Sequence, residues 1–208
     1  YLVKMENNDY IAVLFNISDN ENLVFSELLI IDNKTDKGAL FNIPGNYGSI
    51  IESLSRIERL DILFNHKNPE NMVKKIESIT NLSIDYYVNI EMENLVRIVD
   101  LMSGLEMFIA NPVEQAGSSD LLLLPSGSNV LDGEKIKIFL TANSDDENDS
   151  DLIGRWHKFI QGFIKKNGEI LPYLQNREIF GKYYSFFNTS MNRESFMTFM
   201  RQMKNINS

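Results

Sequence analysis

The residues best suited to chemistry lie in a short basic run, Ile153 to Lys158, which follows an acidic stretch. Arg155 and Lys158 are three positions apart, so they share one face if the run is helical. Where such a run opens a helix, its two cations and free backbone N–H groups can bind an anion such as a phosphate. The competing interpretation is a basic rim that balances the charge of the acidic stretch before it.

That acidic stretch, Asp145 to Asp151, has the composition of a calcium or magnesium loop but not its pattern. An EF-hand loop needs Gly at its sixth position and Glu at its twelfth. Counted from Asp145, these positions hold Ser150 and Trp156. The two histidines, His66 and His157, are far apart and lack the i, i+4 spacing of a zinc helix. The sequence therefore predicts no metal site, and a solvated loop at Asp145 to Asp151.

Other chemistries are excluded by what the chain lacks. There is no cysteine, which excludes disulfides, thiolate nucleophiles and cysteine-ligated metals. No Gly-x-Ser-x-Gly elbow, P-loop or Rossmann glycine fingerprint occurs, so no catalytic residue is predicted from a motif. The formal net charge of -9 argues against nucleic acid as a partner, because a phosphate backbone selects a basic surface.

The elements that must position these residues alternate along the chain. Short apolar runs predict strands, and apolar positions at i, i+3, i+4 and i+7 predict helices. Strands are expected near 10–15, 23–31, 39–43, 86–90 and 105–109, and helices near 69–79, 95–102, 132–140, 153–168 and 193–203. This alternation predicts an α/β protein, with a three-layer α/β/α sandwich around a central mixed sheet. At 208 residues, one domain spanning 1–208 with its core at about 10–203 is expected.

No apolar run approaches the roughly 20 residues of a membrane helix. The chain begins with Tyr1 rather than Met, so we expect an anchor or export signal, where one exists, to lie upstream.

Several stretches together resemble the LytR-CpsA-Psr (LCP) family. They occur in the family's order and spacing over about 10–203, although no single motif is specific by itself. The resembling stretches are Ile43-Pro44, Ile84–Ile90, Leu95–Glu106, Leu131–Lys135, Gly154-Arg155 and Asn188–Ser190.

This resemblance implies an LCP-like fold in a membrane-anchored, extracytoplasmic protein. Members of the family transfer glycopolymers from polyprenyl-pyrophosphate carriers to peptidoglycan. The chain departs from the family pattern where the chemistry lies. Asn22 to Phe25 stands in place of Arg-Ser-Asp-Thr, Gly45-Asn46 in place of Arg-Asp, and Lys158 in place of a second Arg, while Arg155 is kept.

Loss of these groups predicts a pseudoenzyme, because removal of one charge-stabilising donor already costs about 100-fold in rate. We expect the chain to bind a polyprenyl-phosphate-type lipid or an envelope protein or glycopolymer, without a cofactor. The head group would contact Arg155, Lys158 and Asn46. The lipid cleft would be lined by apolar side chains of two helices, Trp156, Ile160, Phe163 and Val99.

The alternative is a weakened phosphotransferase or pyrophosphatase that moves glycopolymer from its carrier to peptidoglycan and uses Mg²⁺ or Mn²⁺. A third interpretation, transcriptional attenuation, follows an older label of the family, and the net charge of -9 counts against it.

Overall fold

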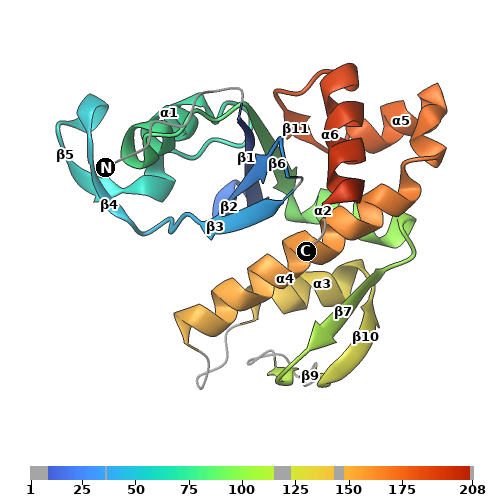
Figure 1. The fold of residues 1–208 in the computed structure, drawn as a ribbon. Coiled ribbons are helices and arrows are strands. Elements are labelled where there is room, and N and C mark those ends of the chain that lie inside the picture. Colours follow the sequence, from blue (N-terminus) through green and yellow to red (C-terminus); the bar gives the residue numbers. More distant parts are fainter. Residues whose placement is uncertain (1–8, 36, 115–122, 143–147, 207–208) are drawn as a thin grey trace. The chain divides into compact units, whose positions relative to one another are not determined.

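The computed structural model describes residues 9–35, 37–114, 123–142 and 148–206 (Figure 1). The chain divides into two compact units. Unit 1 contains Tyr1–Glu91 and Phe187–Ser208, and unit 2 contains Met92–Phe186. The expectation of one domain over 1–208 stays a prediction.

The main sheet of unit 1 has five strands in the order β11-β6-β1-β2-β3 (Figure 1). Strands β1 and β6 are parallel, and the other neighbours are antiparallel, so the sheet is mixed as predicted. Its strands are β1 (Tyr10–Asp19), β2 (Asn22–Asp32), β3 (Gly38–Asn42), β6 (Tyr86–Glu91) and β11 (Asn188–Thr189).

Helices of unit 1 pack on both faces of this sheet, because β1 is apolar on both sides. On one face, a buried cluster joins the sheet to α1 (Glu70–Thr80). Its members are Tyr10, Ala12, Leu14, Leu28, Leu60, Met72 and Ile76. On the other face, the ring of Phe15 lies 6.1 Å from that of Phe199 in α6 (Arg193–Asn205). The prediction of an α/β fold with three layers is thus confirmed within unit 1.

A small hairpin in unit 1 was not predicted. Strands β4 (Gly48–Ile51) and β5 (Arg56–Arg59) pair through η1 (Glu52–Leu54), and η2 (Leu60–Leu63) follows. The cross-strand partners Ile50 and Ile57 are exposed. Because these side chains do not alternate between a buried and a polar face, the run gave no strand signal.

Unit 2 is built from helices around two short β-ribbons. Strand β7 pairs with β10, and β8 pairs with β9, each in antiparallel fashion. The elements are α2 (Met92–Leu101), β7 (Leu105–Ile109), β8 (Val113–Glu114), β9 (Leu123–Leu124), β10 (Gly127–Leu131), α3 (Gly133–Thr141), α4 (Asp149–Ile170), η3 (Tyr173–Gln175) and α5 (Arg177–Tyr184).

Two glycines allow close turns in unit 2. Gly104 has a φ of 89° and follows the α2 segment in a left-handed conformation. At Gly133, the first residue of α3, an added Cβ would lie 2.4 Å from the carbonyl oxygen of Val96. Helices α2 and α3 therefore approach each other where only glycine fits.

Helix α4 starts earlier than predicted. Asn148 is its N-cap, and the side chain of Asp151 completes a capping box, so the helix begins at Asp149 rather than Ile153. Asp149 and Asp151 are therefore helical, and the prediction that they lie in a solvated loop was wrong. The first part of that loop, 145–147, lies outside the described residues. None of the described helices is long and apolar enough to cross a membrane.

Candidate anion-binding pocket

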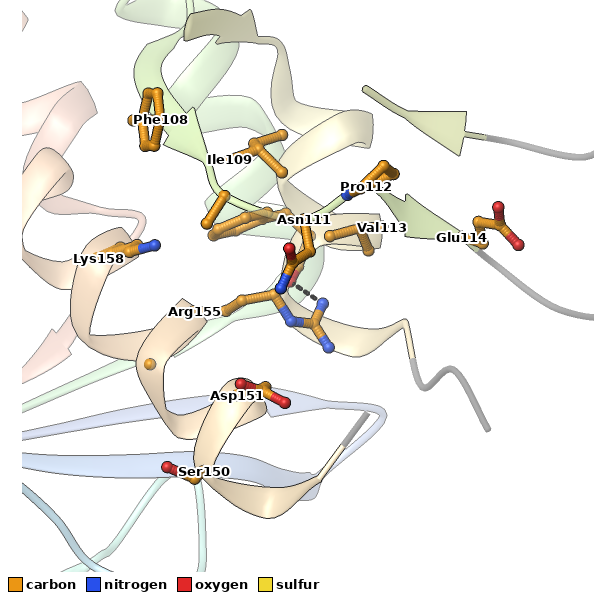
Figure 2. A pocket seen from close by; sticks show the side chains of 13 residues that line it. Phe108, Ile109, Asn111, Pro112, Val113, Glu114, Ser150, Asp151, Arg155 and Lys158 are labelled. Atoms are coloured by element: carbon orange, nitrogen blue, oxygen red, sulfur yellow. Dashed lines mark hydrogen bonds between the residues drawn. The ribbon is translucent and has the colours of Figure 1, made fainter. Parts of the chain in front are cut away.

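A cavity of about 470 Å³ opens in unit 2 beside the N-terminal half of α4 (Figure 2). One wall is formed by α4, including Arg155 and Lys158. The opposite wall runs from Phe108 at the end of β7 to Glu114 in β8, and Phe139 of α3 also lines the pocket. The two cations that the sequence predicted to act together thus line one pocket.

Arg155 is buried, and its guanidinium group holds the end of α3. Its Nη1 donates to the carbonyl of Phe139 and its Nη2 to the carbonyl of Ala142. The guanidinium carbon also lies 5.9 Å from the centre of the Phe139 ring. Since Arg155 lies in the second turn of α4, it does not share the helix start with free backbone N–H groups, and that part of the prediction was wrong.

Trp156 acts with Arg155. Its indole Nε1 donates to the carbonyl oxygen of Leu140 at 3.1 Å. The last carbonyls of a helix have no partner inside the helix, and a cation close to them is favourable. Arg155 and Trp156 therefore cap the C-terminus of α3, a role that sequence reasoning missed. The adjacent pair Arg-Trp gives no signal of which carbonyls it will reach.

Lys158 differs from Arg155 in being exposed. Figure 2 shows its amino group on the pocket side of α4. Among the described residues, no carboxylate forms an ion pair with Lys158. It is thus the cation of this pocket whose donors remain available to a ligand.

The pocket also has acidic and open positions. Asp151 and Glu114 belong to its lining (Figure 2), so its charge is mixed rather than purely basic. At Gly154, nothing lies within 4 Å of the position of an added Cβ, which leaves space along α4 between Asp151 and Lys158. Such a site suits one phosphate group better than a polyanion, because the carboxylates repel additional negative charge.

Asn46 belongs to unit 1, whereas Arg155 and Lys158 belong to unit 2. It is exposed in the turn between β3 and β4, where the Tyr47 amide donates to the Pro44 carbonyl at 3.0 Å. A role for Asn46 with the two cations stays a prediction.

The four lipid-cleft candidates do not line this pocket. Val99, Ile160 and Phe163 are buried in the core, and Phe163 stacks on Phe159 with ring centres 5.5 Å apart. Trp156 is half-buried. Their burial is that of ordinary core residues of unit 2, and the lipid cleft remains a prediction.

A divalent metal has little to bind in the described part of the chain. There, no three His, Asp or Glu side chains gather as a metal ion would require. The positions where the resemblance places charged groups hold Asn22, Val24 and Gly45, which carry no carboxylate. The described residues therefore do not fit the Mg²⁺ or Mn²⁺ of the alternative interpretation.

Comparisons with known proteins agree with this fold. The model of the LytR_cpsA_psr family matches residues 28–208. The structure is similar to that of B. subtilis TagV, with a TM-score of 0.80, 11% identity, and coverage of 96% of this chain and 81% of TagV. B. subtilis TagU gives a TM-score of 0.71 at 19% identity, covering 97% of this chain and 82% of TagU.

A structure described as TagT bound to LI-WTA gives a TM-score of 0.77 at 13% identity, covering 100% of this chain and 80% of TagT. No curated protein sequence matches the chain. At these identities the structures show the fold, and the family model shows the relationship. The chain belongs to the LytR-CpsA-Psr family.

Proposed function

We propose that this chain is an extracytoplasmic, membrane-anchored cell-envelope domain that binds the phosphate of a polyprenyl-phosphate-type lipid and does not catalyse glycopolymer transfer. The observation that carries the proposal is the pocket in which Lys158, without an ion pair among the described residues, lies beside the buried Arg155. The structural neighbour TagT is described as bound to LI-WTA. This supports the proposal that the lipid bound by this chain carries a glycopolymer.

Physical reasons favour one phosphate at this position. The Lys158 ammonium can donate hydrogen bonds to phosphate oxygens, and the fixed charge of Arg155 adds to the attraction. The open space at Gly154 lets the phosphate approach α4, while Asp151 and Glu114 limit the charge that the pocket tolerates.

Loss of catalysis follows from the groups that this chain lacks. Transfer from a pyrophosphate needs cations or a metal to neutralise charge that develops in the transition state. Asn22, Val24 and Gly45 supply neither. Val99, Ile160 and Phe163 fill the core. We therefore assign the pocket at Lys158 to the head group of the lipid rather than to its hydrocarbon chain.

A binding experiment with a short-chain polyprenyl phosphate tests the proposal. Isothermal titration calorimetry of wild type should show saturable binding. Lys158→Ala should weaken it by about 10-fold or more, since a hydrogen bond to a charged group contributes about 1.5 kcal/mol or more. Lys166→Ala is the matched control, because Lys166 lies on α4 outside the pocket lining and pairs with Glu169 at 3.1 Å. Equal affinity of wild type and Lys158→Ala would contradict the proposal.

A further inference from the structure

Unit 1 contains a buried polar row that ends at His66. Ser26 Oγ donates to Asn16 Oδ1 at 2.5 Å, and Asn16 Nδ2 donates to Asn89 Oδ1 at 2.8 Å. These residues are in register on β2, β1 and β6. Asn89 Nδ2 then donates to the main-chain carbonyl of His66 at 2.9 Å, and Asn188 of β11 donates to the same carbonyl. The row therefore fixes the backbone of His66 against the sheet.

The imidazole of His66 is held by a second set of contacts. Its Nδ1 lies 3.0 Å from Ser18 Oγ, and Ser18 Oγ donates to Glu91 Oε2 at 2.6 Å. Nδ1 and Glu91 Oε2 are themselves 3.5 Å apart. Since the Ser18 hydroxyl has one proton and gives it to Glu91, His66 must donate from Nδ1 to Ser18 Oγ.

This arrangement selects one tautomer of His66. With the proton on Nδ1, the neutral ring carries its lone pair on Nε2. Among the described residues, none forms a hydrogen bond with Nε2. The side chain is 21% exposed, so the ring is accessible from solvent.

His66, Ser18 and Glu91 lie at an edge of the sheet where ligands commonly bind. Ser18 and Glu91 are register partners at the carboxyl ends of the parallel strands β1 and β6. Ligands of α/β sheets bind at this edge, because loops diverge there. His66 reaches the same edge from the segment between η2 and α1.

We infer that His66 accepts a hydrogen bond at Nε2 from a hydroxyl group of a ligand at this edge, with Ser18 and Glu91 as its positioning residues. The hydroxyl keeps its proton and donates it to the Nε2 lone pair, so the imidazole stays neutral. The bond from Nδ1–H to Ser18, whose hydroxyl in turn donates to Glu91, keeps Nε2 unprotonated and able to accept. The identity of the hydroxyl, a sugar of the envelope glycopolymer, rests on the proposed function. The tautomer does not.

Nitrogen NMR of the whole chain tests the tautomer. Long-range proton–nitrogen spectra of wild type at a pH where His66 is neutral should show Nδ1 protonated and Nε2 unprotonated. Ser18→Ala and Glu91→Gln should each lose this preference, and Ser18→Ala alone suffices if Glu91→Gln does not fold. A wild-type His66 protonated on Nε2 overturns the inference.

Chemical modification gives an independent measurement, with the other histidine as internal control. Nε2 of His157 is buried. Diethyl pyrocarbonate should therefore modify His66 several-fold faster than His157, measured by peptide mass spectrometry. Equal or slower modification of His66 contradicts an available Nε2.

The ligand is tested with an N-acetylglucosamine oligosaccharide. A saturable shift of the His66 Nε2 resonance supports a sugar hydroxyl as its partner. No shift, in protein that still binds polyprenyl phosphate through Lys158, overturns the sugar assignment and leaves the proposed function standing. A retained sugar shift in protein that does not bind polyprenyl phosphate overturns the proposed function and leaves His66 as a sugar-binding residue.

Discussion

Replacement of Arg155 by alanine should destabilise unit 2, whether or not a ligand is bound. The side chain is 6% exposed and donates to two carbonyls at the end of α3. A hydrogen bond from a charged donor contributes about 1.5–3 kcal/mol. Two such bonds, taken at the lower end of that range, give about 3 kcal/mol. The carbonyls of Phe139 and Ala142 would then need other partners, so this value is a lower bound.

Urea unfolding followed by fluorescence measures this loss directly. Trp156 is the single tryptophan of the chain, and its indole binds the same helix end as Arg155. A loss of 3 kcal/mol should lower the unfolding midpoint by about 1.5 M, for a slope of about 2 kcal/mol per molar urea. Lys158→Ala is the matched control, because Lys158 is exposed one turn further along α4 and should change stability by less than about 0.5 kcal/mol.

The two variants separate a structural role, expected of Arg155, from a ligand-binding role, expected of Lys158. If Arg155→Ala unfolds at the wild-type midpoint, the capping role of Arg155 is refuted and its charge serves the ligand alone. If Lys158→Ala destabilises as much as Arg155→Ala, Lys158 has a structural contact that the geometry does not show.

Three further changes test the physical reasoning. Gly133→Ala should destabilise unit 2 by about 1–3 kcal/mol in urea unfolding, because its Cβ would overlap Val96, whereas Gly181→Ala, with open space, should not. Burial raises the pKa of Glu27 from 4.5 to about 7, so its stabilising contribution is complete below pH 4.5 and disappears as pH rises through 7. Compared with Glu27→Gln, wild type should therefore lose up to about 3 kcal/mol between pH 4.5 and 8. Finally, we expect no release of phosphate from polyprenyl-pyrophosphate analogues with Mg²⁺ or Mn²⁺, and metal-dependent turnover that Arg155→Ala abolishes would contradict the pseudoenzyme proposal.

Periodic apolar positions made much of the fold predictable. Apolar spacing of i, i+3 and i+4 predicted the helix α2, and the residues at that spacing, Leu95, Ile98 and Val99, are all buried. Gly104 follows that segment, and its positive φ is what a residue without Cβ adopts at low cost. These features depend on neighbours in sequence, so local patterns reveal them.

The errors concern features that local apolar patterns do not encode. The start of α4 is set by polar capping at Asn148 and Asp151, so the helix begins at Asp149, four residues before the apolar stripe that defined the prediction. The His66, Ser18 and Glu91 contacts join segments 48 and 73 positions apart, so spacing along the chain could not suggest them. Their only sequence signal is that Ser18 and Glu91 end apolar strand runs, where polar side chains of α/β proteins tend to meet a ligand.

The presence of Arg155 where the resemblance places an arginine is weak evidence for catalysis. In this chain, both terminal nitrogens of its guanidinium group bind main-chain carbonyls of α3, and Trp156 supplies a third donor to the same helix end. A fold that needs this cap will keep the arginine even when the reaction is lost. Lys158 has no such contact with the described residues, so the pocket itself imposes no structural need for a cation there. Evidence for phosphate binding therefore rests on Lys158, and evidence for a hydrogen-bond acceptor at the sheet edge rests on His66, while Arg155 is accounted for by the stability of α3 and α4.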